Sequence, residues 1–518
     1  MRLTRIVLLA CLAALLPAAA LGAAPGPTPI LNGHDFTSGL NPVLNGHDFT
    51  TFGKRPVRRS FVTGHDFSRA ESSRKIIPAL AAEGCLCLLG NFPQSLLALA
   101  QTQPPAAQTS PQPQSDQAYH LPPDKLAKAR TLDRIRITLG ITGALWGLVV
   151  LWLLLRTQSA AAMERWTQRR TRRRWIQGLL FFASFFVITT LAALPLDLAG
   201  HVASLHYGIS VQSWTGWFGD QGKALALEVV LGSLVLLLFN WIVKLSPGRF
   251  WLWCWVIAVP LMIAGTFSSP VFERIFDKFE PLTQHHAALV ADLEKVVART
   301  GTHIPPDRMY LMFAARKTNG LNAYVSGLGA TKHIVVWDTT AGRIPDDQIM
   351  FIFGHETGHY VLNHIVKGLV LSAIAMFIVF FVCARFAAWL VRRNGAQWAV
   401  PDQPGIAPLA TRTGFVAILF ALSIAGFVAA PASNSVSRYF EHQADIYGQE
   451  AIHGLVPDPQ RTAVAAFNSL GEAYLEDPNP NPFIEFWLYD HPSTKNRANF
   501  AAHYDPWANG GHGEFFKQ

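Results

Sequence analysis

The stretch from Phe351 to Phe386 reads FIFGHETGHYVLNHIVKGLVLSAIAMFIVFFVCARF. It opens with a His-Glu-x-x-His pattern and within a few residues becomes almost purely apolar. His355 and His359 are four residues apart, so on a helix they share one face and can bind the same metal ion. Glu356 lies beside that face, where it can accept a proton from water as a general base. The stretch predicts a metal-dependent hydrolytic site on a helix that continues towards a bilayer.

The composition indicates an integral membrane protein. Of the 518 residues, 50% are hydrophobic and 15% are charged, whereas soluble domains carry about 25% charged residues. The net charge of +9 is concentrated in RWTQRRTRRRW, residues Arg165–Trp175. This run lies between two apolar segments, so the positive-inside rule accounts for it. No nucleic-acid recognition motif accompanies it, and nucleic acid is not an expected partner. The five cysteines support neither a disulfide framework nor a thiolate metal site.

The first 120 residues contain several segments of unusual composition. Residues 1–24 resemble a secretory signal. Residues 25–75 form a repetitive leader with three His-Asp pairs, in LNGHDFT at Leu31 and Leu44 and in TGHDFS at Thr63. We interpret these pairs as low complexity rather than a metal site, because no fourth ligand surrounds them. Residues 76–100 are a second signal-like or transmembrane segment, and residues 101–120 are a Pro/Gln-rich linker. One hypothesis is that the chain starts downstream of Met1 or that the first 70 residues are dispensable.

Six later segments are apolar enough to cross a bilayer. Four belong to a membrane domain at residues 121–266, and two lie within residues 367–430. The loops between them are alternately basic and non-basic, as crossing requires. The six segments are Ile137–Leu155, Gly178–Leu196, Ala224–Val243, Phe250–Thr266, Gly368–Val391 and Gly414–Ala430.

Two hydrophilic pieces remain, residues 267–366 and 431–518, and we interpret them as two parts of one protease domain. With the 156–177 loop in the cytoplasm, both pieces lie outside the cytoplasm, so they can assemble. Glu228 lies inside the third apolar segment. An intramembrane carboxylate is a functional candidate, with a buried pair inside a helix bundle as the alternative.

A zinc site needs a third protein ligand. The pattern HExxHxxGxxH is broken here by Asn363 and Ile365, and His364 stands one position early. In SRYFEHQADIYG, Glu441 and Asp445 share a helical face. Glu441 can bind the metal while Asp445 orients a ligating histidine. His364 and His442 remain alternatives; His442 lies about 100° around the helix from Glu441.

The segment TNGLNAYVSGLGATKHIVVWDTT reads as a hairpin. Its strands are expected at Asn322–Ser326 and His333–Asp338, with a turn at Gly327 and Gly329. An edge strand beside the metal can bind an extended peptide by backbone pairing. An ordinary structural hairpin gives the same pattern.

HETGH and RYFEHQAD, with NAYVSG before them, resemble the membrane zinc metalloproteases of the type-1 CAAX prenyl protease family and their bacterial relatives. The resemblance covers about residues 120–500. It also rests on LPPDKLAKA at Leu121, HYGISVQSWTGWFGDQGK at His206, PVFERIFDKFEPL at Pro270 and DHPSTKNR at Asp490.

The resemblance implies a mainly α-helical integral membrane protein, whose transmembrane helices enclose a chamber with a gluzincin-type zinc site at one end. One zinc ion per chain would be held by His355, His359 and Glu441, with Glu356 as the base. Asp445, Arg438 and Arg497 would support the site, and structural salt bridges are the alternative for the two arginines. His491 would stabilise the oxyanion, and Asn322, Ala323 and Tyr324 would lie on the strand that pairs with substrate.

Two features depart from the eukaryotic members. Six apolar spans stand where those members have seven, and Ile76–Ala100 would restore the seventh if it stays uncleaved. The charge pattern also puts the site outside the cytoplasm, whereas eukaryotic members face the cytosol. We therefore expect a protease of a bacterial inner membrane that hydrolyses membrane-associated, prenyl-like or misfolded protein substrates.

Three other classes fit less well. A catalytically silent, chaperone-like protein with a structural zinc does not need Glu356. Site-2-type intramembrane proteases place the HExxH pattern within a span and take an aspartate from a later span. A transporter would show internal repeats of its hydrophobic segments, and none is evident.

Overall fold

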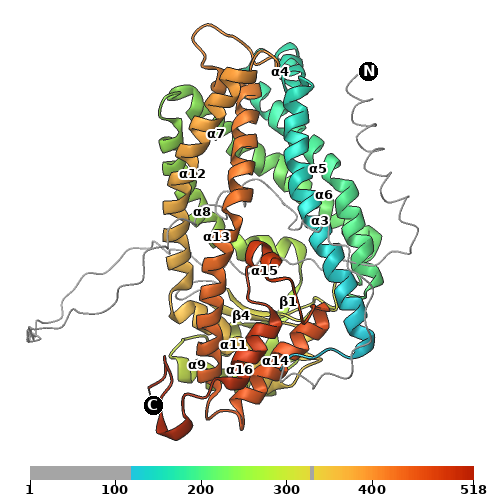
Figure 1. Cartoon of the computed structure of the whole chain (residues 1–518), viewed down its shortest axis with the longest axis vertical. Helices are drawn as coiled ribbons and strands as arrows, with labels where there is room; N and C mark the ends of the chain where they lie inside the picture. Colours follow the sequence, from blue (N-terminus) through green and yellow to red (C-terminus); the bar gives the residue numbers. More distant parts are fainter. Residues whose placement is uncertain (1–117, 327–331, 518) are drawn as a thin grey trace, which may run out of the picture.

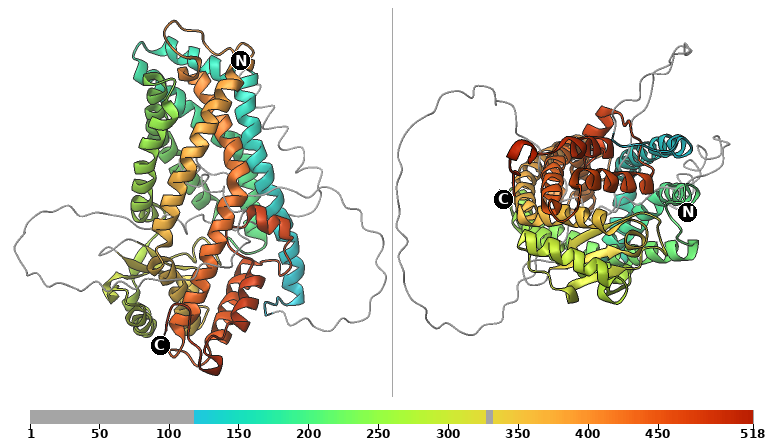
Figure 2. Two further views of the ribbon diagram at one scale, coloured as in Figure 1. Left: turned by 60° about the vertical axis from the view of Figure 1, so that its left-hand side comes forward. Right: turned by 90° about the horizontal axis from the view of Figure 1, so that it is seen from below.

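The computed structural model describes residues 118–326 and 332–517. Apolar helices form a long bundle, and a small sheet with further helices lies at one end of it (Figure 1). Figure 2 shows the same arrangement in two further views. The expected signal-like segments, the repetitive leader and nearly all of the Pro/Gln linker lie outside the described residues.

Five helical stretches in this part of the chain are long and apolar enough to cross a membrane. Each contains one of the expected spans. They are α3 (Pro123–Arg156), α5 (Arg174–His206), the stretch of α6 (Trp214–Leu227), η1 (Glu228–Gly232) and α7 (Ser233–Leu245), α12 (His364–Asn394) and α13 (Arg412–Ile452).

The sixth expected span, Phe250–Thr266, is shorter than the others. It forms the first part of α8 (Phe250–Phe276). The HETGH pattern and the following apolar segment occupy two separate helices, since α11 (Asp346–Val361) ends before α12 begins. Asn363 between them has φ 58°, a left-handed conformation that asparagine tolerates better than most residues. The expectation that the metal helix itself continues into the bilayer is therefore wrong.

The third span contains a short π-helix, η1, which begins at Glu228. The Thr190 hydroxyl of α5 donates a hydrogen bond to Glu228 Oε2 at 3.2 Å. The half-buried intramembrane carboxylate therefore has a hydroxyl partner on α5.

The basic loop and the start of α13 are joined at one end of the bundle. Helix α4 (Ser159–Arg170) carries Glu164, which is buried. Its carboxylate accepts hydrogen bonds from the Thr413 amide at 2.9 Å and the Thr413 hydroxyl at 2.7 Å. Arg412 Nη2 donates to the Arg174 carbonyl at 2.9 Å. From here the 41 residues of α13 run about 60 Å at 1.5 Å per residue. One helix therefore connects the basic end to the opposite end.

A four-stranded sheet has the order β1-β2-β4-β3. Strands β2 and β4 are parallel, and β3 and β4 form the expected antiparallel hairpin, with Ala323 opposite Val336. Strand β3 is thus an edge strand in the described sheet. The strands are β1 (Phe279–Pro281), β2 (Met309–Met312), β3 (Ala323–Ser326) and β4 (His333–Trp337).

Both hydrophilic pieces of the chain contribute to one apolar core at this end. Leu293 and Phe351 from the first piece are fully or almost fully buried with Tyr447 and Phe467 from the second. The remaining helices here are α9 (Ala287–Thr300), α10 (Asp338–Ala341), α14 (Pro459–Tyr474), α15 (Pro482–Leu488) and α16 (Thr494–His503). Single 3₁₀ turns occur at Leu282–Gln284, Pro306–Arg308, Pro408–Ala410 and Ala508–Gly510.

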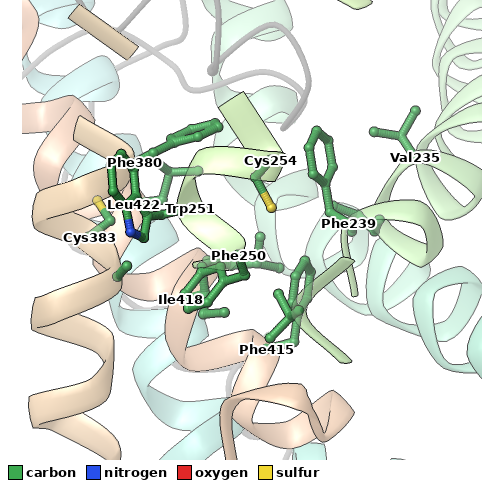
Figure 3. Close-up of a pocket in the computed structure, with 14 residues that line it drawn as sticks. Val235, Phe239, Phe250, Trp251, Cys254, Phe380, Cys383, Phe415, Ile418 and Leu422 are labelled. Carbon is green, nitrogen blue, oxygen red and sulfur yellow. The ribbon is translucent and has the colours of Figure 1, made fainter. Parts of the chain in front are cut away.

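A cavity of about 70 Å³ lies between α7, α8, α12 and α13 within the bundle. Apolar side chains such as Phe239, Trp251 and Phe415 line it, together with the thiols of Cys254 and Cys383 (Figure 3). It offers no charged group for chemistry.

Candidate metal centre

The candidate metal centre forms where α11 crosses α13, and glycines allow the two helices to approach closely. A Cβ atom on Gly448 of α13 would lie 2.8 Å from the backbone nitrogen of His355. A Cβ atom on Gly358 of α11 would lie 2.9 Å from Cβ of Tyr447. Real Cβ atoms are not found at such distances, so larger residues would force the helices apart.

Three side chains meet at this crossing. His355 Nε2 and His359 Nε2 are 3.1 Å apart. Glu441 Oε2 lies 3.2 Å from His355 Nε2, and Glu441 Oε1 lies 3.2 Å from His359 Nε2. Ligand atoms of all three residues fall within 4.8 Å of one another. Two imidazoles and one carboxylate make a donor set that suits zinc and leaves a fourth position for water.

The charges and hydrogen bonds at the crossing fit a bound cation. Glu441 is 2% exposed, and His355 Nε2 lies 3.2 Å from its Oε2 atom. Burial opposes the charged form of His355, yet hydrogen bonds with Asp445 and Glu441 raise its pKa to about 9. The surroundings thus favour positive charge at this point, and a divalent cation supplies it.

Asp445 and Arg497 lie behind His355. Asp445 Oδ1 is 2.9 Å from His355 Nδ1, so it can orient the ring with Nε2 towards the cluster. Arg497 of α16 donates from Nε at 2.9 Å and from Nη2 at 2.6 Å to the two oxygens of Asp445. Burial opposes the charge of Arg497, yet Asp445 raises its pKa. The sequence-based pairing of Asp445 with a histidine matches this geometry.

His491 approaches the cluster from the loop between α15 and α16. Its Nε2 atom lies 3.3 Å from Glu441 Oε2, and its Nδ1 atom lies 2.9 Å from Asp490 Oδ1. Burial opposes its protonation, yet the carboxylates of Glu441 and Asp490 raise the pKa of His491 to about 10. The imidazole therefore stands beside the candidate metal ligands without belonging to the three-residue cluster.

Glu356 follows His355 on α11 and is half-buried. Successive helical residues are about 100° apart, so Glu356 lies to one side of the face shared by the two histidines.

Arg438 of α13 is directed to the loop rather than to the cluster. Its guanidinium donates to the carbonyls of Glu485, at 3.1 Å, and Tyr489. A further bond joins Nη2 to Ser435 Oγ at 2.9 Å. Arg438 therefore anchors the end of α15, two residues before His491.

The predicted substrate strand lies at the edge of the sheet. Asn322 precedes β3, and its carbonyl accepts a hydrogen bond from the Trp337 amide at 3.0 Å. Because hydrogen-bonded pairs alternate along antiparallel strands, the backbone groups of Ala323 then point away from β4. The Tyr324 hydroxyl donates to Glu273 Oε2 of α8 at 3.1 Å.

Sequence reasoning missed the role of His364. Its Nδ1 atom is 3.2 Å from His359 Nδ1, and its ring stacks on Phe440 with centroids 4.5 Å apart. His364 therefore supports His359 from behind. A spacing of five residues does not place His364 on the same helical face as His359. The two side chains meet because the chain breaks at Asn363 between the two helices. The other alternative, His442, is exposed and contacts Phe500.

The paired helices and the His-His-Glu cluster at the end of an apolar bundle define a membrane-bound metallopeptidase. Residues 284–505 match the model of peptidase family M48. Residues 104–278 match a second model, described as CAAX prenyl protease N-terminal, five membrane helices. The chain belongs to the M48 metallopeptidase family.

Known relatives agree with this assignment. An uncharacterised metalloprotease of Bacillus subtilis, YhfN, is 31% identical over 391 residues, which cover 75% of this chain and 88% of the relative. CAAX prenyl protease 1 of Saccharomyces cerevisiae is 26% identical over 331 residues, covering 62% of this chain and 71% of the relative. The crystal structure of Ste24p from S. mikatae has a similar fold, with a TM-score of 0.62 at 22% identity, covering 74% of this chain and 90% of that chain. The protein is therefore a multi-pass membrane metalloprotease, which confirms the predicted family, fold class and enzyme class.

Proposed function

We propose that the protein is a zinc-dependent endopeptidase in which His355, His359 and Glu441 hold the metal. The observation that carries this proposal is the convergence of His355 Nε2, His359 Nε2 and the buried Glu441 carboxylate, whose ligand atoms all lie within 4.8 Å of one another. A buried carboxylate is costly unless its negative charge is compensated by cations and hydrogen bonds. A zinc ion held there would supply a Lewis acid that activates water and polarises the scissile carbonyl.

Glu356 is the general base in this proposal. Its carboxylate takes a proton from the attacking water as the water oxygen bonds to the carbonyl carbon. The same proton is then passed to the amide nitrogen as the C–N bond breaks, which gives a carboxylic acid and an amine. The acid then loses its proton to the amine or to solvent, so the carboxyl product leaves as a carboxylate. Its place next to His355 on α11 supports this role.

His491 and Arg497 assist the reaction in different ways. His491 donates a hydrogen bond to the carbonyl oxygen as negative charge develops on it. Arg497, through its two bonds to Asp445, holds the carboxylate that orients His355. Strand β3 pairs with the extended substrate through its outer edge, where Ala323 directs its backbone groups away from β4, and Asn322 and Tyr324 flank that position.

We infer that the substrates are membrane-associated or misfolded proteins, because the site lies at the end of an apolar helix bundle (Figure 1). The basic loop after α3 is joined to the start of α13, whereas Glu441 lies near the other end of that helix. If the basic loop is cytoplasmic, the site faces away from the cytoplasm. The bacterial relative supports a bacterial inner membrane. The names of the eukaryotic relatives make a prenylated peptide the second substrate to assay.

The deciding experiment compares the detergent-purified wild type with Glu356→Gln at matched zinc content, on an unstructured test protein and on a prenylated peptide. Cleavage by the wild type alone, with one zinc per chain in both, supports the proposal. Equal cleavage by both proteins would exclude Glu356 as the general base. A zinc content that stays below one ion per chain after reconstitution would contradict the proposed metal ligands.

Sidedness is tested separately, with single cysteines placed at Gln168 in α4 and at Gln460 in α14 of a cysteine-free chain. In intact spheroplasts an impermeant thiol reagent should label position 460 and not position 168. The reverse pattern would place the active site in the cytoplasm.

A further inference from the structure

The loop that carries His491 is tethered at Tyr489 from two directions. On one side, Arg438 of α13 donates to the Tyr489 carbonyl. On the other, the Tyr489 hydroxyl donates to Asp133 Oδ1 at 3.0 Å. Burial and the neighbouring Asp133 raise the pKa of Tyr489, so its hydroxyl stays protonated and remains a donor. The backbone of this residue is thus fixed by one helix and its side chain by another.

Asp133 belongs to α3, the first apolar helix in the described chain. It lies one turn before Ile137, where the expected span begins. The same face of α3 presents Arg136, whose Nη2 atom donates to the Tyr474 carbonyl at 2.6 Å. Helix α3 therefore contacts the end of α14 through Arg136 and the loop of His491 through the hydrogen bond between Asp133 and Tyr489.

A short series of contacts connects Asp133 with the candidate metal centre. Tyr489 is two residues from His491, and the intervening Asp490 holds His491 Nδ1 at 2.9 Å. His491 Nε2 then stands 3.3 Å from Glu441 Oε2. A small displacement of Tyr489 would move the imidazole relative to the metal ligands, and misplacement by about 1 Å can cost about a hundredfold in rate.

We propose that Tyr489 and Asp133 are positioning residues for His491, so that the membrane helix α3 takes part in setting the active-site geometry. This inference rests on the proposed role of His491. Neither residue touches substrate; they act by holding the imidazole where the oxyanion forms. Loss of the Tyr489–Asp133 bond lowers kcat, and KM and zinc content stay unchanged because β3 and the metal ligands are not displaced.

The test is a double-mutant cycle on the full-length enzyme in detergent, using an internally quenched peptide derived from a cleaved test protein. Tyr489→Phe removes one hydroxyl and should lower kcat about ten- to a hundredfold without changing KM or zinc content. In a His491→Gln background, the same change should have no further effect, because the group it positions is gone.

Two further variants separate positioning from a purely structural role. Asp133→Asn keeps an oxygen acceptor and should retain near wild-type kcat, whereas Asp133→Leu should behave like Tyr489→Phe. The matched control is Tyr119→Phe, which removes a hydrogen bond to the Glu476 carbonyl at 2.9 Å without contacting the His491 loop. It should change stability more than kcat.

The outcomes separate the two proposals. If His491→Gln lowers kcat but Tyr489→Phe lowers it equally in both backgrounds, the positioning role is overturned and the role of His491 stands. If His491→Gln leaves kcat unchanged, the proposed role of His491 fails, and the positioning proposal fails with it.

Discussion

Gly448 touches the backbone of His355: a Cβ atom at Gly448 would lie 2.8 Å from the His355 nitrogen. Gly448 follows Glu441 by seven residues, about two helical turns, so both residues lie on the same face of α13. This contact sets the separation of α11 and α13. It brings a carboxylate from one helix within 3.2 Å of two imidazoles on the other.

The first prediction follows from this contact. Gly448→Ala should push α11 away from α13 and weaken zinc binding at least tenfold, because the ligands on the two helices no longer converge. Competition with a chromophoric chelator measures the affinity. The control is Gly222→Ala in α6, where nothing lies within 4 Å of the added Cβ. Equal zinc affinity in Gly448→Ala and the wild type would show that the crossing adapts to the added methyl group.

The second prediction concerns Asp445, the partner of His355 Nδ1. Asp445→Asn removes the carboxylate that accepts both hydrogen bonds from Arg497 and weakens the orientation of His355. Losing such an outer partner typically costs 10- to 100-fold in metal affinity, and we expect a loss of that order in the same chelator competition. Asp402→Asn, an exposed aspartate in the loop before α13, is the control and should leave the affinity unchanged. An unaffected affinity in Asp445→Asn would assign Asp445 to a salt bridge of structural value only.

The third prediction is that metal removal destabilises the fold. The proposed ligands lie on two helices, so metal binding free energy contributes to the stability of their contact. A chelator should lower the melting temperature of the wild type and of Glu356→Gln by similar amounts. It should have little effect on His359→Ala, which binds the metal poorly from the start. A chelator-independent melting temperature in the wild type would contradict a metal shared between α11 and α13.

The fourth prediction concerns the carboxyl-terminal tail. Glu450 is fully buried, and its carboxylate accepts hydrogen bonds from the amides of Phe515 at 2.8 Å and Phe516 at 2.9 Å. Phe516 also packs on Tyr447, with ring centroids 5.0 Å apart, and Tyr447 contacts Gly358. Deleting residues 513–518 would remove the backbone amide donors of the tail and leave the Glu450 carboxylate with the Tyr504 hydroxyl, at a cost of about 1–3 kcal/mol.

We therefore expect this truncation to lower the melting temperature by several degrees and to reduce zinc retention. Removing only residues 517 and 518 should change neither, because the bonds to Glu450 remain. If the longer truncation is as stable as the full chain, the tail is not needed to hold the end of α13.

The sequence signals for the candidate metal ligands are local. Two histidines four residues apart, and a glutamate and an aspartate with the same spacing, each define one face of one helix. The hairpin was also predicted nearly to its observed bounds, because strand propensity and a glycine-rich turn are properties of adjacent residues. The break at Asn363 was missed, since an asparagine in a polar segment gives no reliable sign of a left-handed turn.

The amino-acid sequence by itself determined the membrane segments, the candidate metal ligands and the family resemblance, because hydrophobicity and side-chain spacing can be read along the chain. Only the tertiary structure decided how closely α11 and α13 approach, that His364 lies behind His359, and that Asp133 of the first apolar helix reaches Tyr489. These contacts join residues up to 356 positions apart. They depend on distances between helices, which packing at glycines and buried polar pairs sets and which no local pattern encodes.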